Sequence, residues 1–284
     1  MKFSRPEADS YAPDGGDPAQ ALQRTTHLCV AAHQDDIEIM AQAGISECYE
    51  TAGRCFTGVV VTNGAGSPRA GPYAGCSDAE MQALRREEQR RAAQRGKYNL
   101  QLQLSHPSAD VKMPGHAAVA ADLGTIFGGC APAVVYLHNP ADKHDTHVAV
   151  LLRCLEALRA LPRARRPRSV LGCEVWRGLD WLVDADKVPL DASPHPDLSA
   201  ELLRIFDSQI AGGKRYDLAA LGRRTANATF HTSHRTDAAA AVIWAMDLTP
   251  LVADETLSVR EYALGYVERL RADIAARLAK FGGG

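Results

Sequence analysis

Residues 27–40 read "HLCVAAHQDDIEIM", and this stretch decides the fold. An apolar run with the character of a buried strand stops at His33, and two adjacent acids, Asp35 and Asp36, precede further apolar residues with helical spacing. Neither a hydrophobic core nor an ordinary solvated loop needs that order. At a turn from a strand to a helix, such acids either cap the helix or bind something.

The same alternation of apolar runs and amphipathic stretches continues along the chain. Strands are predicted at residues 27–32, 56–62, 100–104, 133–137 and 170–176. Helices are predicted at residues 37–52, 78–96, 117–127, 146–160, 198–209 and 261–281. This order predicts an α/β fold, a Rossmann-like three-layer sandwich with a mostly parallel sheet and a C-terminal elaboration.

The chain is expected to divide into three parts. Residues 1–24 are a polar lead-in rich in proline and glycine, and residues 25–160 form the Rossmann-like metal-binding core. After that core, the alternation of strand-like and helix-like segments is interrupted by "LPRARRPRSV", which contains prolines and basic residues. Residues 161–284 are then expected to complete the same domain with substrate-pocket loops and closing helices.

Composition narrows the classes of partner. The formal net charge is −2, with 46% hydrophobic and 23% charged residues, which favours a small-molecule substrate over nucleic acid. No stretch approaches the roughly 20 apolar residues of a membrane span. The start lacks the apolar centre of a secretory signal, and the seven cysteines form no C-x-x-C pair. A cytoplasmic protein is expected, and formation of a homo-oligomer is left open.

The turn after the first predicted strand is unsuited to a nucleotide. Dinucleotide-binding folds place glycines there so that backbone amides can approach a pyrophosphate. Residues 32–37 instead read "AHQDDI", and two carboxylates at this point would repel phosphate. A later "AGGKRY" segment lacks the spacing and the hydroxyl residue of a phosphate-binding loop.

A second group of histidines and acids lies in "HNPADKHDTHVAV", residues 138–150, directly after the fourth predicted strand. The carboxyl ends of parallel strands share one edge of a sheet, so this group is expected to meet His33 and Asp36 there. Two imidazoles and one carboxylate are typical ligands of catalytic zinc with one position open. The alternatives are helix capping by the acids and histidines that merely hydrogen-bond within loops.

These motifs resemble those of the PIG-L/LmbE-like zinc deacetylases. "AAHQDD" and "HDTH" are similar to the family's "AHPDD" and "HPDH", "VVVTNGAGS" is similar to a strand with its following loop, and "RREEQRRA" is similar to an R-x-x-E-x-x-x-A helix. The resemblance covers about residues 25–160. Beyond it, "FDSQIAGGKRYD" is faintly similar to a late H-x-S-Q segment, with Phe206 in place of the histidine.

The resemblance implies a role for each matching residue. The implied zinc ligands are His33, Asp36 and His147; the general base is Asp35, the oxyanion-stabilising residue is His144, and the substrate-contacting residue is Arg85. The sequence departs from the family at Gln34, which replaces proline, and at Asp145 and Thr146, which replace proline and aspartate. The second departure predicts a different orientation of the histidines by their neighbours.

The resemblance implies a zinc-dependent hydrolase that removes the N-acetyl group from an acetylated amino sugar or its glycoside, releasing acetate and a free amine. The same ligand set also suits Fe²⁺, Co²⁺ or Mn²⁺. Two alternatives are a metal-dependent hydrolase of another amide or ester and a sugar-binding module without catalysis.

Overall fold

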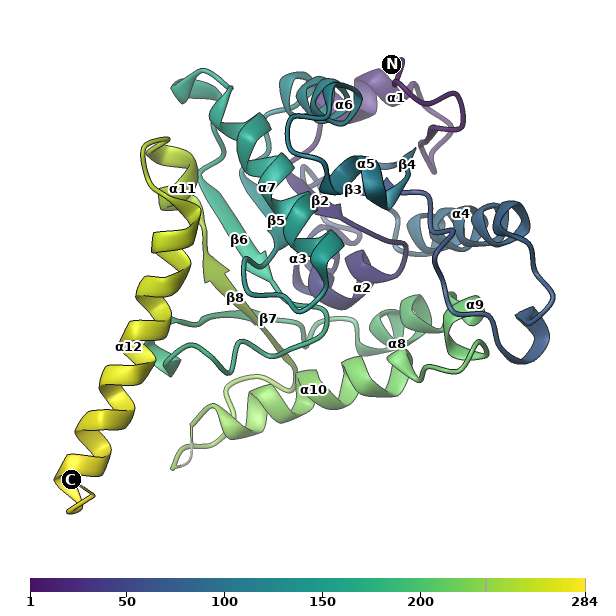
Figure 1. Cartoon of the computed structure of the whole chain (residues 1–284). Helices are drawn as coiled ribbons and strands as arrows, with labels where there is room; N and C mark the ends of the chain where they lie inside the picture. Colours follow the sequence, from purple (N-terminus) through teal and green to yellow (C-terminus); the bar gives the residue numbers. More distant parts are fainter. Residues whose placement is uncertain (233, 284) are drawn as a thin grey trace.

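The computed structural model describes residues 1–232 and 234–283, whose strands form one sheet (Figure 1). The strands are β1 (Asp9–Tyr11), β2 (His27–Ala31), β3 (Phe56–Thr62), β4 (Leu100–His106), β5 (Val134–His138), β6 (Ser169–Cys173), β7 (Val188–Asp191) and β8 (Val242–Asp247). Their order in the sheet is β1-β4-β3-β2-β5-β6-β8-β7.

The five central strands, from β4 to β6, run parallel, and β1, β8 and β7 pair antiparallel at the two edges. β2 lies in the middle, where His27 is opposite Phe56 of β3 and Val134 of β5. The prediction of an α/β fold with a mostly parallel sheet is confirmed.

Helices cover both faces of the sheet (Figure 1). They are α1 (Pro18–Gln23), α2 (Asp36–Met40), α3 (Gln42–Cys48), α4 (Asp78–Arg95), α5 (Ser108–Lys112), α6 (Ala117–Gly129), α7 (Asp145–Arg159), α8 (Pro196–Arg204), α9 (Asp207–Ile210), α10 (Tyr216–Phe230), α11 (Thr249–Ala253) and α12 (Val259–Lys280). None of them is both long and apolar enough to cross a membrane, among the residues described.

Each face of the sheet has its own hydrophobic core, because successive side chains of a strand point to opposite faces. In β2, Leu28 and Val30 join the core beneath α6 and α7, whereas Cys29 and Ala31 join the core beneath α3 and α8. A strand buried on both sides explains why residues 28–32 are continuously apolar.

The chain reverses its direction of winding at β2. From β2 it proceeds outward to β3 and β4, then returns to β5 on the other side of β2. The loops that follow β2 and β5 therefore leave the same edge in opposite directions and open a crevice between them, the usual ligand position in such sheets. Both clusters of acids and histidines lie in these two loops and in the first turns of α2 and α7, which follow them.

Several element boundaries differ from the sequence prediction. The helix predicted at residues 37–52 is divided into α2 and α3 at Ala41, whose φ of −116° and ψ of 18° are not helical. The helix predicted at residues 198–209 is likewise divided into α8 and α9. The lead-in, residues 1–24, contributes β1 and α1, which the sequence pattern did not reveal. The division of the chain at residue 160 stays a prediction.

Candidate active site

The turn between β2 and α2 frees the side chain of Asp35. This residue stands at the N-cap position of α2, but its φ of 79° is left-handed and its carboxylate makes no capping hydrogen bond. A non-glycine residue seldom adopts this conformation, and such strain often accompanies function. Capping therefore does not explain the first acid of the pair, and the carboxylate lines the cavity instead.

Three donor atoms from the two loops lie together at the crevice. Nδ1 of His33 is 3.3 Å from Oδ2 of Asp36, and Nε2 of His147 is 3.2 Å from that Nδ1 and 3.3 Å from that Oδ2. Tetrahedral zinc with bonds of about 2.0–2.2 Å separates its ligand atoms by roughly 3.3–3.6 Å. The triangle thus fits a metal ion above its face, and the donor types suit a divalent transition metal.

The Asp36 carboxylate is surrounded by donors. Its Oδ2 accepts a hydrogen bond of 2.8 Å from the backbone N–H of His33. Burial alone would raise the pKa of Asp36, but His147 and His33 hold it well below its usual range. The carboxylate is consequently ionised at neutral pH, as a metal ligand must be.

A second carboxylate orients His147 from behind. Oδ2 of Asp142 lies 3.1 Å from Nδ1 of His147, which leaves Nε2 to face the crevice, and Oδ1 accepts a hydrogen bond of 2.9 Å from the backbone N–H of His144. The ring of His138 stacks on that of His147, with centroids 4.0 Å apart. Histidine ligands of metals usually have such a partner on the other ring nitrogen.

This arrangement accounts for the departure from the family motif at residues 145 and 146. Asp145 is exposed and makes no side-chain hydrogen bond among the described residues, so it does not orient either histidine. Asp142, five residues before His147, occupies that position instead. The sequence had shown an acid at 142 but gave no reason to prefer it over Asp145.

Asp35 lies beside the triangle and is held by Arg85 of α4. Nη2 of Arg85 donates to Oδ1 of Asp35 at 3.3 Å and to the backbone carbonyl of Gln34 at 2.6 Å, and Nη1 donates to Oγ of Ser67. Burial raises the pKa of Asp35, although Arg85 opposes the shift. A carboxyl with a raised pKa suits proton transfer near neutral pH.

His144 stands at the start of α7 on the other side of His33. Its ring meets that of His33 edge-on, with centroids 5.0 Å apart, and stacks on His147 at 4.6 Å. Burial, with His147 and His33 nearby, lowers the pKa of His144, and its Nδ1 is buried without a hydrogen-bond partner in the described part of the chain. The ring thus lies close to the crevice, and its Nδ1 is available to a ligand.

The inner face of α4 is polar and reaches the site. Glu88 accepts hydrogen bonds from the backbone N–H and the hydroxyl of Ser208, at 2.7 and 2.6 Å. Gln89 accepts from the backbone N–H of Asp35 at 3.4 Å. In this highly charged helix, only Arg85 was predicted from the sequence to belong to the site. The R-x-x-E spacing and the "SQ" pair, both visible in the sequence, were the signals for Glu88 and Ser208.

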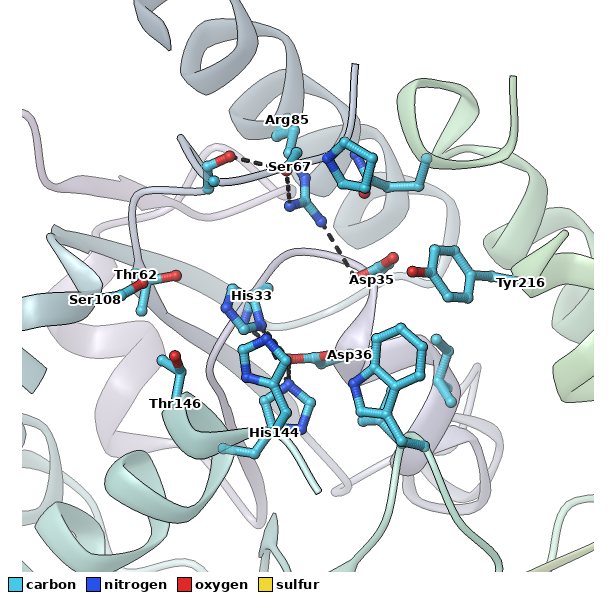
Figure 2. Close-up of a pocket in the computed structure, with 18 of the residues that line it drawn as sticks. His33, Asp35, Asp36, Thr62, Ser67, Arg85, Ser108, His144, Thr146 and Tyr216 are labelled. Atoms are coloured by element: carbon cyan, nitrogen blue, oxygen red, sulfur yellow. Dashed lines mark hydrogen bonds and ion pairs between the residues drawn. The ribbon is translucent and has the colours of Figure 1, made fainter. Parts of the chain in front are cut away.

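The site opens into a cavity of about 250 Å³ (Figure 2). Its floor contains the candidate metal ligands and Asp35, while Thr62 and Ser108 lie at one side. On the opposite side, Tyr216 directs its hydroxyl toward Asp35 (Figure 2). Trp176 also lines the wall. All six residues predicted for the site border this one cavity, while their individual roles stay predictions.

Comparison with known proteins agrees with this geometry. The family model described as "PIG-L: GlcNAc-PI de-N-acetylase" matches residues 28–158. No curated protein sequence gives a significant match.

Several solved structures share the fold. N,N'-diacetylchitobiose deacetylase from Pyrococcus horikoshii has a TM-score of 0.61 and 16% identity, covering 81% of this chain and 86% of that chain. The conserved protein TT1542 from Thermus thermophilus has a TM-score of 0.60 and 15% identity, covering 82% and 99%. GalB, the 4-carboxy-2-hydroxymuconate hydratase from Pseudomonas putida, has a TM-score of 0.55 and 17% identity, covering 79% and 96%. The prediction from the motifs agrees with this match, in which residues 28–158, a little under half of the chain, fit the PIG-L family model.

Proposed function

We propose that this protein is a metal-dependent hydrolase that removes the acetyl group from an N-acetylated amino sugar or its glycoside. The observation that carries the proposal is the triangle of His33, Asp36 and His147 with the free carboxylate of Asp35 beside it in one cavity. The match to a de-N-acetylase family and the likeness to a diacetylchitobiose deacetylase support the acetylated amino sugar as substrate class.

His33, Asp36 and His147 would hold the metal, and zinc is proposed because two imidazoles and one carboxylate are a common catalytic zinc set. When bound, the metal supplies a Lewis acid that polarises the acetamide carbonyl and lowers the pKa of a water to about 7. Asp142 keeps Nε2 of His147 directed at the metal through its contact with Nδ1.

Asp35 would act as the general base and then as the general acid. Its carboxylate takes a proton from the attacking water and later gives that proton to the leaving amine, so one residue serves both transfers. The contact with Arg85 fixes the carboxylate at the cavity wall. Both terminal nitrogens of Arg85 donate to the protein itself, and the guanidinium would contact the substrate from this fixed position.

His144 would stabilise the negative charge that develops on the carbonyl oxygen. It borders the cavity next to His33, and its ring can present an N–H toward an oxygen placed above the metal triangle. Removing one such donor typically costs about 10²–10³ in kcat. The same residues would also cleave an ester, so the choice of an amide rests on the family.

Acetate release tests the proposal. Wild-type protein is incubated with a panel of N-acetylated sugars and one O-acetyl ester, before and after treatment with a chelator. We expect acetate from at least one acetamide, loss of this activity on chelation, and its return when zinc is added. Asp35→Asn should lower kcat by about 10²–10⁴ while the metal is retained.

His116→Ala is the matched control. This histidine also faces a carboxylate, at 3.7 Å from Asp110, but it does not border the cavity. The variant should keep full activity. Acetate release that neither the chelator nor Asp35→Asn reduces would contradict the mechanism, and release from the ester alone would reassign the bond.

A further inference from the structure

The peptide group between Gln34 and Asp35 is held at both of its polar ends by α4. Nη2 of Arg85 donates to its carbonyl oxygen, on Gln34, at 2.6 Å. Its N–H, on Asp35, donates to Oε1 of Gln89 in a longer hydrogen bond of 3.4 Å. Arg85 and Gln89 are four residues apart in α4 and therefore share one face of that helix. A single turn of α4 thus sets the orientation of this peptide plane.

The orientation of that plane determines the backbone conformation of the proposed general base. Rotation of the peptide group changes ψ of Gln34 and φ of Asp35, and the φ of 79° at Asp35 is left-handed. A residue with a side chain seldom adopts this conformation, which costs about 1–3 kcal/mol and persists only where the surrounding structure imposes it. The two contacts from α4 act on the peptide group whose rotation would relieve the strain.

The side-chain amide of Gln89 is fixed in the orientation that accepts from Asp35. Its Nε2 donates to Oε1 of Glu38 at 2.8 Å and to Oε1 of Gln101 at 3.4 Å. A flipped amide would place its oxygen against these two oxygens and its Nε2 against the N–H of Asp35, so all three hydrogen bonds would be lost. Gln89 is fully buried, which makes each lost bond costly.

Glu38 connects this contact back to the start of α2. It is fully buried, and its Oε1 also accepts a hydrogen bond of 2.7 Å from the hydroxyl of Tyr98. Glu38 stands three residues after Asp35, where the glutamate of a capping box bonds directly to the N–H of the capping residue. Here Gln89 lies between the two, because the N–H of Asp35 donates to Gln89 and Gln89 donates to Glu38.

This connection through α4 leaves the Asp35 side chain unoccupied by helix capping. In an ordinary capping box, the side chain of the capping residue bonds to the backbone N–H three residues later. The carboxylate of Asp35 makes no such bond and lines the cavity instead. Gln89 and Glu38 therefore support the start of α2 while the carboxylate stays available for proton transfer.

We propose that Gln89, held by Glu38, is a positioning residue for the general base: it keeps the backbone of Asp35 left-handed and so places the carboxylate beside the metal triangle. The proposal rests on the proposed deacetylase function and adds a residue to it. Gln89 does not border the cavity, so it acts through Asp35 and not on the substrate. Its loss is expected to lower kcat and to leave KM nearly unchanged.

Gln89→Met tests this role, because methionine fills a similar volume but makes neither hydrogen bond. Acetate release from the N-acetylated sugar that the wild type hydrolyses fastest gives kcat and KM, and bound zinc is measured on the same samples. We expect kcat to fall about 10–100-fold, since a misplacement of about 1 Å can cost 10²-fold. KM should stay within about 3-fold of wild type, and zinc content should not change.

Exchanging the two side chains separates positioning from general destabilisation. Gln89→Glu keeps an acceptor for the N–H of Asp35 but sets two carboxyl groups against each other. In Glu38→Gln/Gln89→Glu, the amide at position 38 can donate to the carboxylate at position 89, which restores the connection. The double variant should recover kcat to within about 3-fold of wild type, whereas Gln89→Glu should stay at least about 10-fold below it.

Gln42→Met is the matched control. This glutamine is also fully buried and donates to Oγ of Ser46 at 3.0 Å, but it lies in α3 and does not border the cavity. It should keep the wild-type kcat even where it lowers the free energy of unfolding.

Three results would overturn the positioning role and leave the deacetylase intact: wild-type kcat in Gln89→Met, an equal loss of kcat in Gln42→Met, or a double variant no faster than Gln89→Glu. If Gln89→Met does not fold, the comparison of Gln89→Glu with the double variant decides. No acetate from the wild type with any N-acetylated sugar would count against the proposed function itself.

Discussion

Oδ2 of Asp142 lies 3.1 Å from Nδ1 of His147, and both side chains are buried. This contact fixes which ring nitrogen of His147 faces the cavity. It also explains how the chain tolerates the loss of an acid immediately before that histidine, because a carboxylate from the preceding loop reaches the same ring.

Asp142→Ala should therefore weaken metal binding without removing a ligand. The free His147 ring could rotate or change tautomer, and loss of such a partner typically costs about 10–100-fold in metal affinity. Zinc titration of metal-free protein measures the change. Asp145→Ala is the control, since that exposed acid touches neither histidine, and equal losses in the two variants would contradict the assigned partner.

The Glu88–Ser208 contact should contribute to the stability of the fold. Glu88 is fully buried and accepts two hydrogen bonds from Ser208. Ser208→Ala removes one donor, and we expect the free energy of unfolding to fall by about 1–3 kcal/mol, measured by denaturant titration. Glu87→Ala, on the exposed side of α4, should change it by less than about 0.5 kcal/mol. A free energy of unfolding that is the same in Ser208→Ala as in wild type would show that the contact does not form.

Glu174 should make stability depend on pH. It is 6% exposed, and burial raises its pKa from 4.5 to about 7, although the backbone N–H of Leu179 donates to it at 2.7 Å. Between these two values the folded state binds the proton and the unfolded state has lost it. The contribution of this group is thus fully present below pH 4.5 and is lost as pH rises through 7.

Glu174→Gln should remove that loss. Relative to wild type, the variant should become more stable by about 3 kcal/mol between about pH 4.5 and pH 8, since one pKa unit corresponds to about 1.4 kcal/mol. Thermal unfolding across this range measures the difference. Parallel stability profiles for the two proteins would mean that the carboxyl is not desolvated.

Much of the fold could be predicted because its signals are local. The run at residues 56–62, "FTGVVVT", is rich in β-branched residues and forms β3 with the predicted bounds. Two strands beyond residue 180 were not predicted. β7 contains Pro189, and a proline within a short segment argues against a strand except at an edge, where β7 lies. β8 was missed although its sequence, VIWAMD, is apolar and rich in strand formers. α10 was missed because Gly222, Thr225 and Asn227 weaken its helical pattern.

The site was predictable as far as its motifs extend. His33, Asp36 and His147 could be placed at one sheet edge because the ends of parallel strands meet there. The acid that orients His147 could not be predicted. Asp142 and Asp145 are both near His147 in sequence, and only the path of the loop brings Asp142 to the ring. Gln89 and Glu38 likewise come together only through the tertiary fold.

Zinc binding by metal-free protein tests most directly the central claim, that His33, Asp36 and His147 form one metal site. Equilibrium titration of wild type should give one zinc ion per chain, with affinity lowered at least 100-fold in His147→Ala and in Asp36→Asn and unchanged in His116→Ala. Wild-type affinity in the His147→Ala and Asp36→Asn proteins would contradict the account, and so would the absence of zinc binding in the wild type.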